Sequence, residues 1–364
     1  MKDSDGMLAL LQDIKELLWG IALLSAGGFL CLIGIVIGAD YPIATSMITE
    51  FSNTRQRAFS IGFIAAMWYV GATCADLVGY WLYDVEGGWR WMLGSAVIPC
   101  ILILIGRFDL PESPRWLLRK GRVKECEAMM IKLFGEPVVF DEEAPQETRF
   151  LQLFNRRHFP FVLFVAAIWT CQVIPMFAIY TFGPQIVGLL GLGAGKSAAL
   201  GNVVISLCFM LGCIPPMFWL NSAGRRPLLI GSFIMMTLAL AVLGLIPDMG
   251  AWLVVLAFAV YAFFSGGPGN LQWLYPNELF PTDIRASAVG VIMSLSRIGT
   301  IVSTWALPVF ITKYGISNVM LMGAGISLIG LLVSIAFAPE TRSLTLAQTS
   351  QMTIRSKPVT RAGY

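Results

Sequence analysis

Two acid–arginine pairs recur at the same spacing, each just after a long apolar segment. Glu50 precedes Arg57 by seven positions, and Glu278 precedes Arg285 by seven. Carboxylate and guanidinium groups form charge-assisted ion pairs when they meet. Such pairs can hold two parts of a protein together in one state and release them in another. The repeated spacing therefore marks these residues as candidates for a gate.

A second pair of short motifs follows each acid–arginine pair at a constant distance. PES at 111–113 and PET at 339–341 place Glu112 and Glu340 62 positions beyond the first glutamate of each set. Two matched spacings predict a duplicated unit of three helices. The alternative interpretation is that the charges are interface residues and helix caps worth ~0–1 kcal/mol each. The predicted gate pairs are Glu50 with Arg57, Glu112 with Arg115, Glu278 with Arg285, and Glu340 with Arg225 or Arg226.

Two charged residues fall inside apolar segments. Asp40 lies 11 positions before Phe51 and Arg297 lies 12 positions after Arg285, which corresponds to depths of about 16 and 18 Å along a helix. Ions at such depth are costly and usually face a cavity or one another. The residues alone leave open a structural Asp40–Arg297 pair, or an Arg297 that binds helix carbonyls.

Several polar or amphipathic side chains lie in the middle of apolar segments. They are candidates for contacts with a substrate, and the alternative is that they form hydrogen bonds between helices. Asp76 lies about 27 Å from Arg57 by helix rise, which favours a hydrated acid near the membrane surface. The candidate substrate-binding residues, with Arg297, are Gln172, Asn202, Asn270, Gln272 and Trp273.

Metal and nucleophilic chemistry are not indicated. His158 is the single histidine, and the seven cysteines form no CxxC pair. We interpret the cysteines as small apolar packing residues. No cluster with metal-ligand spacing, no nucleotide motif and no basic face for nucleic acid is found, so we expect no cofactor, no metal and no enzymatic activity.

The stretch SGGPG at 265–269 interrupts an apolar segment with glycine and proline. Gly266, Gly267 and Gly269 carry no side chain, and Pro268 lacks a backbone donor. These residues predict a thin and kinked helix. Membrane helices tolerate this where they line a cavity or pack very closely.

The composition places the chain in a membrane. Hydrophobic residues make up 57% of the chain and charged residues 13%, against roughly 25% in soluble domains, and the mean hydropathy is +0.74. A span needs about 20 apolar residues. The nine predicted spans are 29–50, 58–82, 89–109, 159–182, 197–220, 227–246, 251–275, 287–312 and 316–338.

Charge bias between the loops predicts the orientation. Alternate loops, including the C-terminal tail, hold 19 Lys and Arg, whereas the opposite set holds only Lys196 and Lys313. The first set, with the C-terminus, should therefore be cytoplasmic. The expected parts are an atypical amphipathic N-terminal segment (1–28), three helices of a first half (29–110), a cytoplasmic linker with short helices (111–158), a six-helix second half (159–338) and a cytoplasmic tail (339–364).

The motifs resemble the major facilitator superfamily, in its sugar-porter-like branch. The resemblance covers about residues 31–345 and depends on PESPRWL at 111–117, GRRPLL at 224–229, Glu278 with Arg285, and PETR at 339–342. It implies an all-α, polytopic membrane bundle with about nine of the family's twelve transmembrane helices, the first three being absent. It also implies that Gln172 matches one glutamine of a sugar-binding motif, although Cys171 and Pro175 depart from that motif. The likeness is to bacterial inner-membrane metabolite transporters.

We therefore expect a secondary active transporter of a small metabolite, an organic anion or sugar-like compound, that is coupled to protons and works by alternating access. GADYP at 38–42 resembles a helix of phosphate/proton symporters, and SRIGT at 296–300 resembles a helix of organic-anion transporters. These resemblances imply the hypothesis that Asp40 takes up a proton and Arg297 pairs with a substrate anion. The expected partners are membrane lipid, a small-molecule substrate and the proton, and nucleic acid is not expected. The sequence does not predict the oligomeric state. The alternative function is a truncated, non-transporting membrane remnant or partner subunit.

Overall fold

The computed structural model describes residues 57–108, 120–134, 150–189, 195–246 and 250–342, together with a few single residues outside these ranges. The chain divides into two compact units, Met1–Ala44 and Thr45–Tyr364. The first unit is described only at isolated positions, which are helical. Asp40, Glu50, Arg115, residues 1–27 and the tail beyond 342 lie outside the described residues, and Arg57 is described by its backbone alone, so the predictions for them remain predictions.

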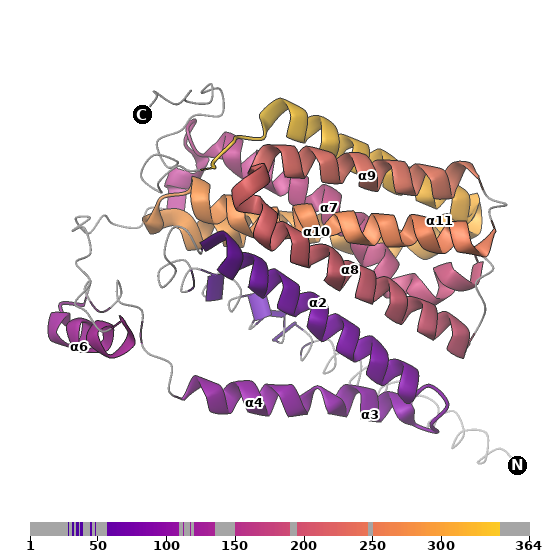
Figure 1. Cartoon of the computed structure of the whole chain (residues 1–364), viewed down its shortest axis with the longest axis horizontal. Helices are drawn as coiled ribbons and strands as arrows, with labels where there is room; N and C mark the ends of the chain where they lie inside the picture. Colours follow the sequence, from indigo (N-terminus) through magenta and orange to yellow (C-terminus); the bar gives the residue numbers. More distant parts are fainter. Residues whose placement is uncertain are drawn as a thin grey trace, which may run out of the picture. The chain divides into compact units, whose positions relative to one another are not determined.

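The described part of the second unit is helical and contains no strand, which confirms the expected all-α class. In Figure 1 the helices are labelled, and their colours follow the sequence from indigo to yellow. The elements are α2 (Arg57–Trp81), α3 (Gly88–Ser95), α4 (Val97–Arg107), α6 (Val123–Phe134), the 3-10 helix η1 (Phe150–Phe154), α7 (Phe159–Leu189), α8 (Lys196–Ala223), α9 (Arg225–Leu245), α10 (Ala251–Leu279) and α11 (Thr282–Phe337).

Seven helices in the described residues are long and apolar enough to cross a membrane. One of them, Gly88–Gly106, combines α3 and α4. Another, within α11, covers both expected spans 287–312 and 316–338, because α11 continues through a kink at Gly315, whose φ is +79°. Large apolar side chains such as Trp252 and Trp305 are 84% and 80% exposed, as expected for a surface that contacts lipid.

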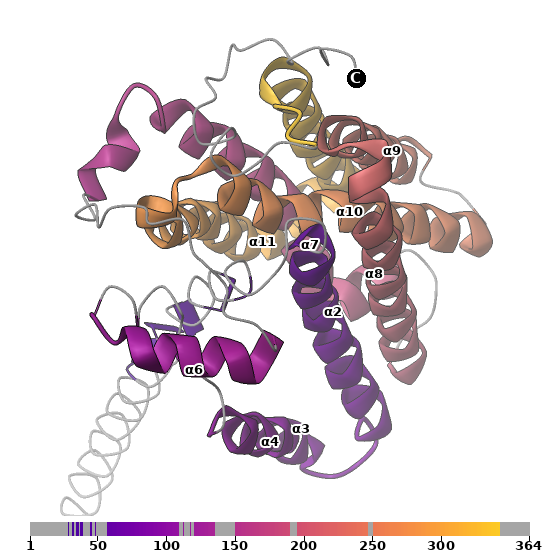
Figure 2. The same cartoon turned by 60° about the vertical axis from the view of Figure 1, so that its left-hand side comes forward.

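Helix α10 packs against five other helices, α2, α7, α8, α9 and α11, and Figures 1 and 2 show it among them. Its glycines explain how this is possible. A Cβ at Gly266 would lie 2.1 Å from the Gly212 carbonyl oxygen of α8, and a Cβ at Gly267 would lie 2.1 Å from Ser232 Oγ of α9. Of the two settings expected for SGGPG, a cavity wall or close packing, the structure shows close packing at Gly266 and Gly267, and α10 runs as one helix through Pro268.

The two expected halves meet along α2 and α8, which pack against each other. Gly62 on α2 faces α8, where an added Cβ would lie 2.8 Å from Met217 Cγ. Aromatic rings extend this interface: Tyr69 on α2 stacks on Phe209 of α8, with 5.8 Å between ring centroids and 7° between planes. This helix pair positions the polar groups described below.

Candidate functional site

A buried polar centre forms where α2, α7 and α10 meet. Gln172 on α7 donates from Nε2 to Ser265 Oγ on α10 at 3.0 Å and to the Met176 sulfur at 3.3 Å. The Tyr69 hydroxyl on α2 donates to the same sulfur at 3.3 Å. A Cβ at Gly269 would lie 3.2 Å from the Tyr69 hydroxyl oxygen, so this glycine lets α10 approach α2 closely. The centre joins a helix of the expected first half to two helices of the second.

Among the buried side-chain oxygens on α7 and α10 that accept no hydrogen bond from the described residues, three belong to the candidate residues. They are Gln172 Oε1, Asn270 Oδ1 and Gln272 Oε1, and their side chains are at most 7% exposed. A buried acceptor left without a donor costs ~1–3 kcal/mol. These oxygens are therefore suited to accept hydrogen bonds from the hydroxyl groups of a ligand.

The amide nitrogens of Gln172 and Asn270 are held by the protein. Asn270 donates from Nδ2 to the Cys213 carbonyl oxygen of α8 at 3.0 Å. The Trp273 ring of α10 packs edge-on against Trp169 of α7, with 4.7 Å between centroids. Three of the five uncharged candidates from the sequence, namely Gln172, Asn270 and Trp273, thus make contacts between helices, and Gln272 is buried on α10.

Arg297 on α11 faces α7 rather than lipid. Its guanidinium carbon lies 5.0 Å from the centroid of the Phe177 ring, which is cation–π geometry. Phe177 in turn packs edge-on against Trp68 of α2, with 6.1 Å between centroids. A half-buried guanidinium beside the wall between α2 and α7 can bind an anion. Its proposed partner Asp40 lies outside the described residues.

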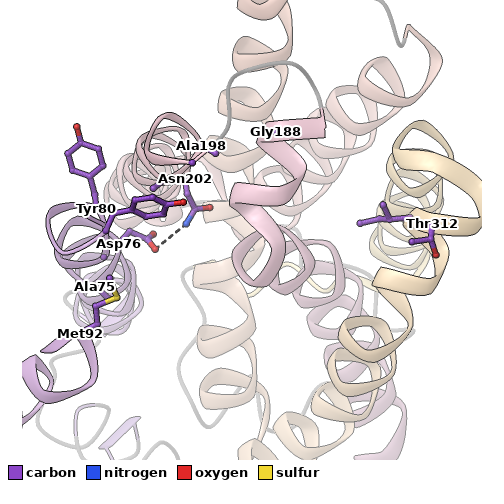
Figure 3. A pocket seen from close by; sticks show the side chains of 13 residues that line it. Ala75, Asp76, Tyr80, Met92, Gly188, Ala198, Asn202 and Thr312 are labelled. Atoms are coloured by element: carbon purple, nitrogen blue, oxygen red, sulfur yellow. Dashed lines mark hydrogen bonds between the residues drawn. The ribbon is translucent and has the colours of Figure 1, made fainter. Parts of the chain in front are cut away.

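Asn202 belongs to a second cluster, at the end of the bundle that carries the α2–α3 turn, here called the Asp84 end. Asn202 Nδ2 on α8 donates to Asp76 Oδ1 on α2 at 3.1 Å, and Ser206 Oγ donates to Asp76 Oδ2. Asp76 lines a cavity of about 900 Å³, seen in Figure 3. Asp76 was expected to be a hydrated acid near the membrane surface, and it does line the cavity. In addition, its carboxylate joins α2 to α8 through Asn202 and Ser206.

The opposite end of the bundle, at the α8–α9 turn, carries an ion pair and is called the Arg225 end. Arg225 Nη2 lies 3.0 Å from Glu278 Oε1, and the two side chains are 7% and 9% exposed. Arg225 also donates from Nη1 to the Leu220 carbonyl oxygen at 2.8 Å, and Thr341 donates to Glu278 Oε2 at 2.6 Å. Glu278 thus pairs with Arg225, a contact that the spacing did not predict. Arg285, which the spacing predicted as the partner of Glu278, is also buried, at 3% exposure, and its pairing with Glu278 remains a prediction.

Glu340 caps the first turn of α9 at the Arg225 end. Its carboxylate accepts from the backbone N–H of Arg225 at 3.0 Å and of Arg226 at 3.1 Å. Gly224, with φ of +93°, lies so close that an added Cβ would be 2.7 Å from Glu340 Oε2. The sequence predicted contact between Glu340 and these two residues, and the structure places the contact on their backbone. The Arg226 side chain instead donates to the Ile335 carbonyl oxygen at 2.8 Å.

Glu112, in the PES motif, is exposed, and its described electrostatic neighbour is Arg122 before α6. Arg122 hydrogen-bonds Glu125 and thereby holds the pKa of that exposed carboxyl below its ordinary value. Among the described residues no group of three or more His, Cys, Asp or Glu could hold a metal ion.

Several polar residues of these clusters were not candidates from the sequence, among them Ser265, Thr341, Tyr69, Asp76 and Ser206. In the sequence, Tyr69 is one of many aromatic residues in an apolar span, Asp76 was interpreted as an acid near the membrane surface, and Ser206 is a small residue of a predicted helix. The one available signal was Asp76, because a carboxylate inside a spanning segment is costly and marks a polar neighbour. The identity of that neighbour depends on the packing of α2 on α8.

The sequence pattern of the sugar (and other) transporter family matches residues 9–353. YaaU of Escherichia coli (strain K12), named for metabolite transport, is 90% identical over 326 residues, covering 90% of this chain and 74% of that protein. The inner membrane metabolite transport protein YgcS from the same organism is 34% identical, covering 88% and 72%.

A solved structure with the same fold is the proton:xylose symporter XylE of the major facilitator superfamily, bound to 6-bromo-6-deoxy-D-glucose. Its TM-score is 0.70 at 19% identity, and the match covers 84% of this chain and 69% of XylE. With its apolar spanning helices and with transporters rather than enzymes as relatives, the chain is a multi-pass membrane protein of the sugar (and other) transporter family.

Proposed function

We propose that the chain is a proton-coupled secondary transporter of a small hydroxylated metabolite, sugar-like or an organic anion, that works by alternating access. The observation that carries this proposal is the polar centre of Tyr69 and Gln172, which share the Met176 sulfur across the contact between α2 and α7. A substrate bound there touches both halves, so binding can bias their relative movement.

The buried acceptors define the chemistry of the substrate. Gln172 Oε1, Asn270 Oδ1 and Gln272 Oε1 are acceptors, so they favour a ligand with several hydroxyl donors. Trp273, which is half-buried and packs edge-on against the buried Trp169, supplies an apolar ring surface of the kind that packs against the C–H face of a sugar-like molecule. The name of XylE, a proton:xylose symporter, supports both the sugar-like substrate and the coupling to protons.

Arg297 adds a preference for negative charge. A guanidinium that lies over the Phe177 ring can direct N–H donors toward a carboxylate or phosphate oxygen. A hydroxylated carboxylic acid would satisfy both Arg297 and the acceptors on α7 and α10. In this proposal Asp40 takes up the coupled proton and Asn202 contributes to the path from the Asp84 end.

The Arg225 end is proposed to be cytoplasmic, with the C-terminus, in a bacterial inner membrane. The charge bias of the loops supports this orientation. The boundaries at residues 29, 111, 159 and 339 are proposed as those of the two halves, the linker and the tail. The proposed cytoplasmic gate consists of Glu50, Arg57, Glu112, Arg115, Arg225, Arg226, Glu278, Arg285 and Glu340.

The test is uptake into proteoliposomes containing the full chain, driven by an inward proton gradient and screened over hydroxylated organic acids, phosphate and hexoses. We expect uptake of at least one compound that stops when a protonophore is added. Arg297→Gln should lower uptake of an acid by tenfold or more but leave uptake of a neutral sugar largely unchanged. The exposed Asn318→Ala variant serves as the control. Absence of gradient-driven uptake for all three classes would contradict the proposal.

A further inference from the structure

The cavity at the Asp84 end is separate from the polar centre and lies between α2, α3, α7, α8 and α11. Figure 3 shows Asp76, Tyr80 and Asn202 on one side of it and Thr312 on the other. Among the described residues that line this cavity of about 900 Å³, Asp76 alone carries a charge. A single carboxylate in an otherwise neutral wall of a spanning helix needs an explanation, because intramembrane ions are costly and functional by default.

The carboxylate of Asp76 is bound from the other half of the protein. Asn202 Nδ2 donates to Oδ1 at 3.1 Å, and Ser206 Oγ donates to Oδ2. Asn202 and Ser206 lie one helical turn apart on α8 and are 6% and 1% exposed, whereas Asp76 on α2 is half-buried. The bridge therefore has a buried side on α8 and an accessible side on the cavity.

The charged and titratable neighbours leave Asp76 without a cation among the described residues. Lys196, at the start of α8, pairs with Asp84 beyond the cavity and lies over the Tyr80 ring at 5.4 Å. Tyr180 on α7 is close enough to Asp76 for an electrostatic interaction. From the polar centre to the Asp84 end, the titratable and charged groups on the elements around Asp76 are Tyr69, Cys74 and Tyr80 on α2, Tyr83, Asp84 and Glu86 in the following turn, Arg90 on α3, Cys171 and Tyr180 on α7, Lys196, Cys208 and Cys213 on α8, Tyr261 on α10, and Arg297, Lys313 and Tyr314 on α11, and of these Tyr80 and Tyr83 line the cavity with Asp76.

We propose that Asp76 is a proton-binding site that controls closure of the cavity at the Asp84 end. When the carboxylate is ionised, its two charge-assisted hydrogen bonds hold α2 to α8 and close the space between the halves. A proton from the aqueous phase at the Asp84 end binds one carboxylate oxygen and leaves a neutral carboxyl group. Its hydrogen bonds to Asn202 and Ser206 are then about half as strong, so α2 and α8 separate more easily.

The position of the bridge makes this consequential for transport. In alternating access one half moves against the other, so every contact between α2 and α8 near the cavity must loosen when that end opens. This step rests on the proposed transport function, in which the Asp84 end faces the outside. The binding of the proton itself does not require a substrate, so it can be tested without one.

The experiment measures how accessible the cavity is at different pH values. Ala199 lines the cavity, and Ala199→Cys places a thiol there, whereas Glu86→Cys places one in the exposed α2–α3 turn as a reference. Intact cells that express the full chain are labelled with a membrane-impermeant maleimide at external pH values from acidic to alkaline. Labelling of the parent chain, which has its own cysteines, is subtracted from that of each variant. The rate for Ala199→Cys is then divided by the rate for Glu86→Cys, which removes the pH dependence of the reagent.

We expect this labelling ratio to rise as the pH falls, by about fivefold for each weakened hydrogen bond. Asp76→Asn, which has the shape of the neutral carboxyl group, should give the high ratio at every pH when it is added to both thiol variants. Asp84→Asn, which removes an exposed ion pair worth little, should keep the pH dependence.

Two results would overturn the proposal. One is a labelling ratio that does not change with pH when Asp76 is intact, and the other is a pH dependence that persists unchanged in Asp76→Asn. Replacement of external sodium by choline at constant pH should have no effect on the ratio. A large effect would identify a sodium site instead.

The outcome is distinguishable from that of the uptake assay. If gradient-driven uptake fails for every compound but the labelling ratio responds to pH through Asp76, the transport proposal fails and the proton site stands. If uptake succeeds and the ratio is the same with and without Asp76→Asn, the proton site is wrong and transport stands. If Asp76→Asn abolished labelling of the Glu86→Cys reference, that variant would not be folded. Ser206→Ala would then provide the second test, because it should raise the labelling ratio at neutral pH.

Discussion

Arg225 Nη2 donates to Glu278 Oε1 at 3.0 Å inside the protein, where both side chains are less than a tenth exposed. The pair joins the α8–α9 turn to the end of α10, and all of these elements belong to the proposed second half. A pair within one half moves with that half as a rigid part. A gate between the halves therefore needs a partner from the proposed first half, for which Glu50 and Arg57 remain the predicted residues. The main expected role of the Arg225–Glu278 contact is to stabilise the fold.

Glu278→Gln should destabilise the protein by about 3–5 kcal/mol, because it leaves the buried Arg225 guanidinium without a counter-charge. The measurement is the unfolding free energy in detergent by denaturant titration. The double variant Arg225→Met with Glu278→Met should recover at least half of the loss, since it removes both buried charges.

The matched control for this variant is Arg122→Gln, which breaks an exposed pair with Glu125 whose side chains are 46% and 58% exposed. Its effect should be below about 0.5 kcal/mol. If Glu278→Gln cost no more than this control, the Arg225–Glu278 pair would have no structural role.

Glu340→Gln should weaken the start of α9. The Glu340 carboxylate accepts from two backbone N–H groups in the first turn, where the helix dipole favours negative charge. Loss of the charge should cost about 0.5–2 kcal/mol of unfolding free energy. Glu112→Gln, at the matching PES motif in the proposed linker and exposed, should change the unfolding free energy little. Equal effects of the two substitutions would show that Glu340 is not a cap.

Gly266→Ala should be strongly destabilising. Its Cβ would lie 2.1 Å from the Gly212 carbonyl oxygen, so α8 and α10 would have to move apart, at a cost of about 3 kcal/mol or more. Gly290→Ala is the control in a spanning helix, because a Cβ there meets nothing within 4 Å, and it should be neutral or stabilise by ~0.5–1 kcal/mol. Thermal unfolding of the two variants side by side provides the comparison, and similar melting temperatures would contradict the close contact between α8 and α10.

The features that depend on local sequence could be predicted. Length and hydropathy located the spanning segments, and SGGPG indicated the close packing of α10, because both follow from residues adjacent in the chain. The contact between Glu278 and Arg225 could not be predicted in this way. Near Glu278 the chain is not one helix, because α10 ends at Leu279, Phe280 is extended with φ of −103°, and a new helix begins at Thr282. Arg225 reaches Glu278 from 53 positions away.

The polar centre shows the same limit. Gln172 was a candidate because an amide inside a span needs a partner, but Ser265 and Tyr69 are 93 and 107 positions from the residues they contact. Helix rise gave the depth of Asp76 but not the helix that it faces. Depth follows from the chain alone, whereas the facing helix follows from how α2 packs on α8.

Ser265→Ala should lower substrate affinity without removing any group that faces the substrate. Ser265 Oγ accepts from Gln172 Nε2 at 3.0 Å and so fixes the direction of Gln172 Oε1, the oxygen that is proposed to accept from a substrate hydroxyl. Loss of one hydrogen bond worth about 1 kcal/mol should raise the dissociation constant of a compound that the uptake assay identifies by about fivefold. Gln172→Leu removes the acceptor and should raise it by tenfold or more, since the substrate hydroxyl is then buried unpaired.

These two variants can be compared by equilibrium binding to the purified protein. The control is Ser294→Ala on α11, where Ser294 Oγ is exposed and bonds only its own helix, at the Gly290 carbonyl oxygen. Ser265→Ala and Gln172→Leu together should be no worse than Gln172→Leu alone, because Ser265 acts through Gln172 and has nothing left to orient. Additive losses in the double variant would mean that Ser265 contacts the substrate directly. They would contradict the proposal that Ser265 acts only by orienting the amide of Gln172.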